Sequence, residues 1–436
     1  MTNEPNTSHP GLDRSVGVAG AVMLGLGSIL GTGVFVSLGM ATTLAGPWVL
    51  IAIGVAMVIA LCNGLSSAQL AAAHPVSGGT YEYASRLISP GLGFTAGWLF
   101  LSAKSASAAS AALGASVYMM GTEGAADRSV VVVTALGIVA LTTLLVLSGL
   151  RRSNLVNTVI VSFVFVGLIV FLFTAFRSVS DVEGTTLASP RPSGIPEAVA
   201  IVFVAFTGYG RVATLGEEIR NPRRSIPLAV IATLLVAGTL YLLVGAALAF
   251  AAPASQLVSS NAAISPLEVV ATHHGGRTLG TIVAICAVTA MIGVLINLLL
   301  GLSRVMLAMG RRSDMPRAMA WVGQSSRTPV WSVLSVGCIT AGLVLIGDLA
   351  FTWTLSALMV LGYYAITNLA ALRLRDEERR FPKWTAWSGC ILCLAAACSL
   401  PAAIWWTGTI VLAAGFGCRF GIRFLEGRNN VSRDEK

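Results

Sequence analysis

One lysine of this sequence lies deep in an apolar stretch, where a charge is costly. Lys104 is near the middle of the stretch 91–119. Ionisable residues inside apolar helices are usually paired or functional, and Lys104 is about a dozen residues from either end, too far for its ammonium to reach water comfortably. The sequence therefore favours a buried role for Lys104, such as the exchange of a proton.

Five glycines lie in the first apolar stretch, LGLGSILGTGVFVSLG, residues 24–39. A helix that unwinds in an apolar medium exposes N–H and C=O groups that cost several kcal/mol each unless a polar group satisfies them. Free N–H groups around Gly31 to Gly33 would form the positive end of a helix dipole, which suits a carboxylate. The alternative is close helix packing, which the four-residue spacing of Gly27 and Gly31 also permits. We expect Gly25 and Gly27 to let neighbouring helices approach and Gly31 and Gly33 to leave amides free.

A second apolar stretch is interrupted in the same way, in VFVAFTGYGR, residues 202–211. Carbonyls freed around Ala205 to Gly208 would suit an ammonium group or a metal cation. An amide site and a carbonyl site together indicate an α-amino acid, which carries both charges a few ångströms apart. Arg211 directly follows the interruption, and its role is open between coupling, contact with water and an ion pair with Glu217 or Glu218.

The composition indicates an integral membrane protein. Of 436 residues, 55% are hydrophobic and 11% charged, and the mean hydropathy is +0.81, too little polar surface for a soluble globule. Continuous apolar runs of about 20 residues are typical of membrane helices rather than of a barrel. Twelve runs emerge, at 17–38, 46–72, 91–119, 129–148, 154–176, 195–217, 226–251, 277–308, 329–347, 350–372, 385–402 and 404–424. The last two are separated by little more than Pro401, so eleven crossings stay possible.

The basic residues predict the orientation. With a cytoplasmic N-terminus and twelve crossings, only four of the 28 Lys and Arg residues fall outside: Arg128, Arg177, Arg191 and Arg277. This asymmetry favours an even count in the cytoplasmic membrane, with both tails, 1–15 and 425–436, in the cytoplasm. The net charge of +9 is then explained by basic residues in the cytoplasmic segments, where anionic lipid headgroups beside helix ends attract them. Nucleic acid is not an expected partner.

The two interrupted stretches are the first and the sixth, an odd offset of five. Because each crossing reverses direction, a repeat of helices 1–5 (16–176) in helices 6–10 (195–372) would be inverted in the membrane. Paired glycine-interrupted segments in inverted halves indicate a transporter site near the bilayer midplane. Residues 384–424 would form two further helices.

At these residues the chain resembles the amino acid, polyamine and organocation transporter family. Four segments carry the resemblance: GSILGTGVF in the first run, HPVSGGTYEY with GFTAGW between the second and third, FVAFTGYG in the sixth, and EEIRNPRRSIP before the seventh. The resemblance implies an all-α fold shared with the bacterial leucine transporter, with ten core helices in two inverted repeats, two peripheral helices and alternating access to a central site.

The resemblance also implies the site. The carboxylate-binding segment would be Ile29, Leu30, Gly31, Thr32 and Gly33, and the amine-binding segment would include Ala205, Phe206, Thr207, Gly208 and Tyr209. We expect Phe206 to be the gate, with Phe203 and Tyr209 as alternatives, while core packing is an equally good account of each single aromatic ring.

Two smaller features lie outside these segments. HPVSGGTYEYASR, residues 74–86, predicts a surface or re-entrant helix after a turn at Gly78 and Gly79. For Glu82 a solvated charge is the default, and an ion pair with a cytoplasmic arginine is the alternative. Cys390 and Cys393 share a helical turn without a second ligand pair, which favours packing over a metal site.

The charges within the runs indicate the substrate and the coupling ion. Asp and Glu are absent from the depths of the twelve runs, which favours neutral or anionic over cationic amino acids. Some proton-coupled relatives have a lysine in the fifth helix, where this chain has Val164, so Lys104 is the candidate substitute. Na⁺ stays an alternative, although neither Thr289 nor Asn297 of the eighth run can be assigned to a sodium site.

The sequence thus predicts a secondary transporter that moves neutral amino acids by alternating access, as a proton symporter. An amino acid exchanger and a non-transporting amino acid sensor with the same fold are the alternatives. We expect neither an enzyme nor a cofactor or metal, because no nucleophile and base constellation falls inside the predicted bundle.

Overall fold

The computed structural model describes residues 17–74, 78–121, 127–149, 154–177, 192–214, 219–251, 265–323 and 328–434. Within these residues every regular element is a helix, which confirms the all-α prediction. The α-helices are α1 (Val18–Ile29), α2 (Leu38–Ala45), α3 (Val49–Ala73), α4 (Thr80–Leu87), α5 (Pro90–Met120), α6 (Arg128–Leu147), α7 (Asn154–Arg177), α8 (Ile195–Phe206), α9 (Gly210–Thr214), α10 (Pro222–Phe250), α12 (Pro266–Arg311), α13 (Val330–Ile346), α14 (Leu349–Leu372), α15 (Lys383–Cys398) and α16 (Ala402–Asp434).

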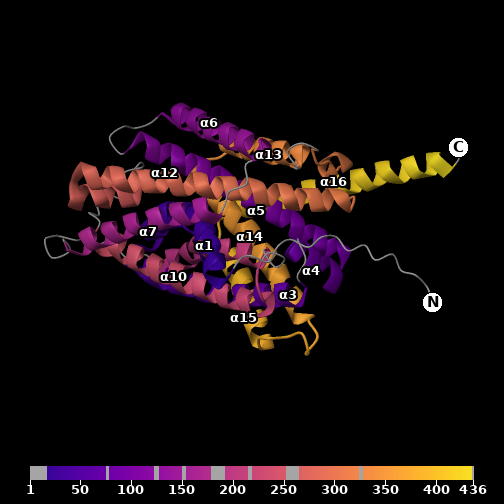
Figure 1. Cartoon of the computed structure of the whole chain (residues 1–436), viewed down its shortest axis with the longest axis horizontal. Coiled ribbons are helices and arrows are strands. Elements are labelled where there is room, and N and C mark those ends of the chain that lie inside the picture. The colour runs from indigo at the N-terminus through magenta and orange to yellow at the C-terminus, as the bar shows by residue number, and fades with distance from the viewer. Residues whose placement is uncertain are drawn as a thin grey trace.

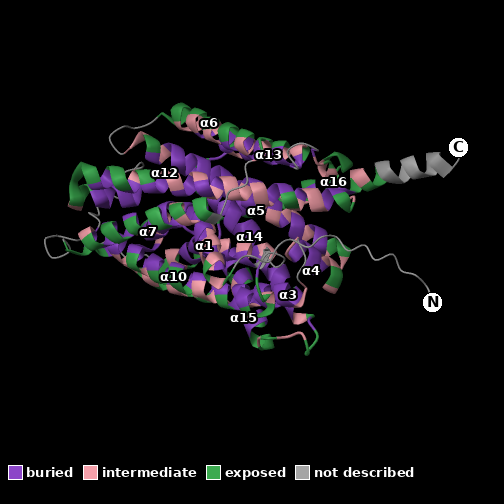
Figure 2. Cartoon of the chain, in the orientation of Figure 1, coloured by how far each residue is buried: buried purple, intermediate pink, exposed green. Residues whose placement is uncertain are grey.

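Most long helices run along the long axis of the molecule as a bundle (Figure 1). Eight described helical segments are long and apolar enough to cross a membrane, and three shorter apolar helices, α1, α13 and α15, accompany them. Large apolar side chains such as Leu144, Phe173 and Ile346 are exposed on the outer helices, as Figure 2 shows for the outer faces of α6, α7 and α10. The chain is therefore a multi-pass membrane protein, and the count of twelve crossings in two inverted repeats stays a prediction.

Glycines let the helices of the bundle approach closely. A Cβ on Gly25 would lie 2.8 Å from Thr233 of α10, and one on Gly27 would lie 2.2 Å from Asn157 of α7. This confirms that these two glycines serve packing. The sequence boundary at residue 277 is also confirmed, because Gly276 has a φ of 70° and separates a short helix, 266–275, from the long part of α12.

The predicted turn and helix after α3 are confirmed. Gly78 and Gly79 have φ angles of 122° and 56°, in the region that favours glycine, and α4 follows directly. The default interpretation of Glu82 was wrong, because this side chain is only 9% exposed and accepts from Arg86 at 2.7 Å and from Arg312 at 2.6 Å. Burial among basic groups favours the ion pair over a solvated charge.

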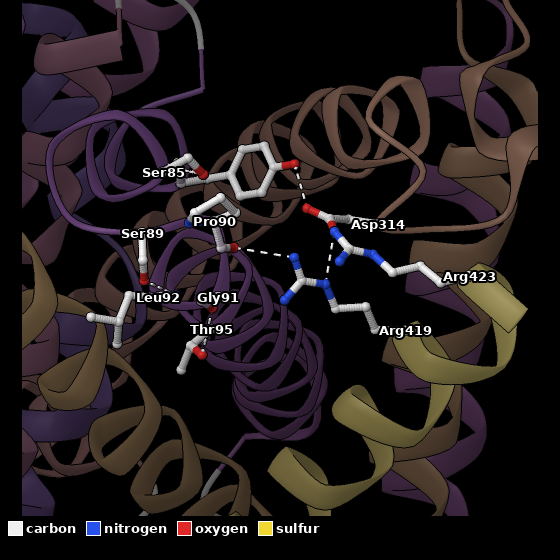
Figure 3. A network of polar contacts seen from close by, with 10 residues as sticks. Ser85, Ser89, Pro90, Gly91, Leu92, Thr95, Asp314, Arg419 and Arg423 are labelled. Carbon is white, nitrogen blue, oxygen red and sulfur yellow. Dashed lines mark hydrogen bonds and ion pairs between the residues drawn. The ribbon is translucent and has the colours of Figure 1, made fainter.

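Asp314, just after α12, joins α4, α5 and α16 (Figure 3). Its carboxylate accepts from the Tyr81 hydroxyl at 2.8 Å, from Arg419 Nε at 2.9 Å and from Arg423 Nη2 at 3.1 Å. Arg419 also donates to the Pro90 carbonyl at 3.2 Å. Burial, and next the hydrogen bond to Asp314, raise the pKa of Tyr81 well above its ordinary value, so its hydroxyl stays a donor at neutral pH. We call these residues the Asp314 clamp.

We expect the Asp314→Ala variant to lose about 3 kcal/mol of stability, because removing one partner leaves Arg419 buried without its counter-ion. The measurement is the apparent melting temperature in detergent. Asp376→Ala is the control, since Asp376 is 86% exposed beside Arg379 and such a pair contributes less than about 1 kcal/mol. Equal shifts in the two variants would contradict a stabilising role for the Asp314 clamp.

Candidate functional site

The first apolar segment is broken where the glycines predict it. α1 ends at Ile29, Leu30 takes extended backbone angles, and a π-helical turn, η1 (Gly33–Ser37), follows. The Leu30 amide donates to the Leu26 carbonyl, and the next turn bond along the chain runs from the Phe35 amide to the Gly31 carbonyl. No backbone carbonyl of the described residues accepts from the amides of Gly31 and Thr32. Donors are therefore free at this break.

The sixth apolar segment is broken in a different way. α8 ends at Phe206, and a 3₁₀ turn, η5 (Thr207–Tyr209), leads into α9. The Thr207 hydroxyl donates to the Val204 carbonyl at 2.7 Å, and the Tyr364 hydroxyl donates to the Thr207 carbonyl at 3.4 Å. The same two carbonyls also accept from the backbone amides of Thr207 and Gly210, so these hydroxyls add to the N–H donors of the 3₁₀ turn.

The two breaks touch each other. A Cβ on Gly208 would lie 2.4 Å from the Ser28 carbonyl oxygen, so only glycine fits there. The hydroxyl of Tyr241, on α10, is 3.0 Å from the Ile29 carbonyl and 3.2 Å from the Ala205 carbonyl. One tyrosine therefore satisfies a carbonyl from each broken helix.

Two cavities adjoin the breaks. The smaller has a volume of about 30 Å³ and is lined by Ser28, Ile29, Thr32, Gly33, Lys104, Ser107, Val204, Ala205, Thr207, Val294, Leu298 and Trp353. The larger has a volume of about 190 Å³ and extends from Ser28, Lys104 and Thr207 to Gly78, Gly79 and Tyr81 beside α4. Lys104 lines both cavities, so it lies where they meet.

Lys104 is buried, as its position in the sequence predicts. The residue is only 9% exposed, and its ammonium group donates to the Thr207 hydroxyl at 2.7 Å. Among the described residues no carboxylate lies within ion-pair distance of it. A lysine that lacks a carboxylate partner and bonds to the break in the sixth segment can release and take up a proton. Its ammonium form can also attract an anionic group of a ligand.

Eight of the twelve predicted site residues, Lys104 among them, line one or both of the two cavities. Ile29, Thr32, Gly33, Ala205 and Thr207 line the smaller cavity, while Thr207, Gly208 and Arg211 line the larger one. Leu30, Gly31, Phe206 and Tyr209 are buried and line neither cavity. A Cβ on Gly31 would lie 2.6 Å from Val294 of α12, so Gly31 also serves close packing.

The aromatic candidates for a gate pack against other rings. Phe206 lies 4.9 Å from Tyr241 between ring centroids, and Phe203 and Tyr209 lie 5.7 and 5.5 Å from Tyr364. Trp353 of α14 is the aromatic residue that lines the smaller cavity, and its indole N–H donates to the Ile201 carbonyl at 3.1 Å.

Sequence reasoning missed Tyr241, Trp353 and Ser107. A tyrosine, a tryptophan or a serine in an apolar helix is also common in ordinary packing, so nothing local marks these three. Asn297 lines the larger cavity and Thr289 lines neither. Glu217 and Glu218, the predicted partners of Arg211, lie outside the described residues.

The two cysteines on one turn of α15 are buried and free. Cys393 lies next to Asn63 of α3, whose amide nitrogen is 3.1 Å from the sulfur. These contacts fit the packing interpretation.

Comparisons with known proteins agree with this architecture. The amino acid permease family matches the chain over residues 20–417. A transporter of Mycobacterium tuberculosis (strain H37Rv) is 35% identical over 422 residues, which cover 96% of this chain and 93% of that protein. The branched-chain amino acid permease of Bacillus subtilis is 27% identical over 85% of this chain and 83% of its own length. Human cationic amino acid transporter 4 is 29% identical over 86% of this chain and 62% of its own length.

The match extends over nearly the whole chain and includes both broken segments. The chain therefore belongs to the amino acid permease family, whose members are membrane transporters of amino acids and not enzymes.

Proposed function

We propose that this chain is a secondary transporter that moves neutral amino acids across the cytoplasmic membrane by alternating access, with H⁺ as the coupling ion. One observation carries the proposal: the breaks in α1 and α8 meet at a cavity that Lys104 also lines. Twelve crossings in two inverted five-helix repeats would place this cavity near the bilayer midplane.

The backbone at the two breaks would hold the charged groups of the substrate. The free amides of Gly31 and Thr32 suit the carboxylate. Tyr241 already donates toward the Ile29 and Ala205 carbonyls, but a carbonyl oxygen has two lone pairs and can accept from an ammonium group as well. The amine would thus lie beside Tyr241.

The walls of the smaller cavity favour a neutral side chain. Val204, Val294, Leu298 and Trp353 offer apolar surface, and no carboxylate is among the described residues that line it. Lys104 would repel a cationic side chain. The relatives include both a branched-chain amino acid permease and a cationic amino acid transporter, so the proposal of a neutral substrate rests on the walls of this cavity.

The larger cavity supports alternating access. It extends from Lys104 toward α4 and includes Arg304, an exposed residue near the end of α12. With both termini cytoplasmic, α4 would lie on the cytoplasmic side, and this cavity would be the inward path. Trp353 lines the smaller cavity and bonds to the Ile201 carbonyl of α8, and it would close the path on the opposite side.

Uptake into proteoliposomes tests transport, with labelled leucine, alanine, lysine and glutamate and with H⁺ and Na⁺ gradients imposed separately. We expect leucine or alanine to accumulate under an inward H⁺ gradient, and lysine to be excluded. Exchange without net accumulation would favour the exchanger. Binding of leucine without any flux would favour the sensor and overturn the transport proposal.

Lys104→Ala should remove accumulation driven by the H⁺ gradient, by about tenfold or more, while exchange of labelled for unlabelled substrate changes by less than about twofold. The physical reason is that exchange returns the carrier loaded and needs no change in protonation. Ser105→Ala is the matched control, because Ser105 is a buried neighbour on α5 that lines neither cavity. Equal loss of accumulation and exchange in Lys104→Ala would assign Lys104 to binding or folding instead of coupling.

Tyr241→Phe should lower the apparent melting temperature and raise the Kd of the transported amino acid about tenfold, a change of about 1.4 kcal/mol. The variant leaves the Ile29 and Ala205 carbonyls without their shared donor, which costs about 1–3 kcal/mol. In Tyr118→Phe, the control, a tyrosine away from both cavities loses its bond to the Phe35 carbonyl. That control should lose stability only, and an equal change of Kd in both variants would refute the special role of Tyr241.

A further inference from the structure

One face of α12 forms a wall of the larger cavity. Leu298 lines both cavities, whereas Asn297, Gly301 and Arg304 line the larger one only. These three residues follow at spacings of four and three, and residues three or four apart lie on the same face of a helix. An amide, a glycine and a cation therefore follow one another along this wall.

Arg304 lies at a distance from the broken helices. It follows Leu298, where the two cavities meet, by six residues, which is about 9 Å along the helix. The residue is exposed, and α12 ends at Arg311. Arg304 therefore lies in the outer part of the larger cavity, and Lys104 lies in its inner part.

The Arg304 guanidinium has no counter-ion in the described part of the chain. No carboxylate of these residues lies within ion-pair distance of it. Arg211 of α9 lines the same cavity, but it already has an interaction within the protein. Arg304 is therefore the better-placed cation for an anionic ligand.

The rest of the larger cavity suits the uncharged part of an amino acid. The described residues that line it include no Asp or Glu, so none of them competes for a guanidinium. Phe100 and Tyr363, whose ring centroids are 5.3 Å apart, line the cavity, and Leu302 and Val305 add aliphatic surface. The volume is about 190 Å³, against about 30 Å³ for the smaller cavity. The larger cavity thus combines a cation, apolar walls and more room.

The cavity is open between Asn297 and Arg304. A Cβ on Gly301 would meet no other part of the protein within 4 Å. Gly31 and Gly208 differ, because a Cβ on either would collide with a neighbouring helix. Gly301 is therefore not needed for close packing, and a ligand can pass along α12 at this point.

We propose that Arg304 forms a second carboxylate-binding site, which holds the α-carboxylate of an amino acid between the broken helices and the cytoplasm. The inference rests on the proposed function, because it needs the larger cavity to be the inward path. A planar guanidinium can hold a carboxylate through two parallel N–H···O bonds. The ammonium group of the same molecule would pack on the rings of Phe100 and Tyr363.

The site at Arg304 and the site at the breaks would act in sequence. A substrate that arrives from the cytoplasm meets Arg304 first, whereas one that arrives from outside first reaches the amides of Gly31 and Thr32. Asn297 and Gly301 line the stretch between the two sites. Loss of Arg304 should therefore weaken capture at the cytoplasmic face and leave capture at the outer face unchanged.

The competing account treats Arg304 as an ordinary cytoplasmic arginine. Lys and Arg are common near the cytoplasmic ends of membrane helices, where they set the orientation and attract anionic lipid headgroups. Arg311, on the same helix, is exposed and lines neither cavity, so it is the matched control. An arginine of this ordinary kind would not change the capture of substrate at one face alone.

Exchange of labelled for unlabelled leucine tests the site in the full-length protein. Inside-out membrane vesicles expose the cytoplasmic face, and right-side-out vesicles expose the outer face. The KM for leucine is measured on each face without an ion gradient, so that proton coupling plays no part. The second readout is inhibition by isocaproate, which has the carboxylate and side chain of leucine but lacks the ammonium group.

We expect Arg304→Gln to raise the KM at the cytoplasmic face about tenfold, because bonds to a charged group are lost, and to change the KM at the outer face by less than about twofold. Arg304→Lys keeps the charge but not the planar fork, so it should raise the cytoplasmic KM about threefold. Isocaproate should inhibit the wild type from the cytoplasmic face and lose this effect in Arg304→Gln. Arg311→Gln should match the wild type in every readout.

Gly301→Leu tests the path between the two sites. The new side chain would fill the open stretch of the cavity, and its Cβ meets no packed neighbour. We expect the maximal exchange rate to fall about tenfold on both faces, while isocaproate still inhibits from the cytoplasmic face. Gly342→Leu is the control, since Gly342 of α13 is equally open and lines neither cavity. An unchanged rate in Gly301→Leu would show that substrate does not pass this point and would overturn the inference.

Two further results would overturn the site at Arg304 while leucine transport by the wild type leaves the proposed function intact. One is an unchanged cytoplasmic KM in Arg304→Gln, and the other is an equal rise of the KM on both faces. Wild-type vesicles that transport no leucine would refute the proposed function and the inference with it.

Discussion

Backbone groups that an apolar medium cannot satisfy are the constraint on which this structure depends. Breaking α1 and α8 removes helical hydrogen bonds where no bulk water is at hand. The carbonyls of Ile29 and Ala205 share the Tyr241 hydroxyl, whereas those of Val204 and Thr207 keep backbone donors in the 3₁₀ turn and also accept from the Thr207 and Tyr364 hydroxyls. These acceptors are thus satisfied within the protein, while no backbone carbonyl of the described residues accepts from the amides of Gly31 and Thr32.

This asymmetry accounts for the chemistry of the site. A positively charged group would meet the Ile29 and Ala205 carbonyls, which already accept from Tyr241. A negatively charged group would meet the amides of Gly31 and Thr32, which donate to no backbone carbonyl of the described residues. Lys104 adds a cation beside the break in the sixth segment, so the centre of the bundle has donors in excess. An amphoteric molecule with a carboxylate and a neutral side chain fits this balance better than a cationic molecule does.

Rigid contacts surround the broken helices. The Asp314 clamp ties α4, α5 and α16 together through charged groups that are mostly buried, and α5 packs against α12 and α14. Gly78 and Gly79, both with positive φ angles, lead into α4 of this clamp. The Asp314 clamp thus places charged groups where each has a partner of opposite charge.

Much of this could be predicted from single residues. The glycines of 24–39 predict the break at Leu30 and Gly31, the two glycines before α4 predict its turn, and the depth of Lys104 in its segment predicts its burial, because each follows from local backbone geometry or from distance along one helix. Glu82 shows the limit of such reasoning. Its partner Arg312 is 230 residues away, and nothing near Glu82 in the sequence indicates that the two approach.

Contacts between distant helices were decided by the tertiary structure alone. Tyr241 reaches carbonyls 212 and 36 residues away, and Ser110 pairs with Thr352 across 242 residues. Apolar periodicity specifies that a helix is buried but not which neighbour a single hydroxyl faces. By itself, then, the sequence determined an all-α membrane protein with two broken helices and one buried lysine, because hydropathy and glycine act locally. Only packing decided that the breaks meet at Tyr241 and that Phe206 lines neither cavity, because those outcomes depend on how helices far apart in the chain fit together.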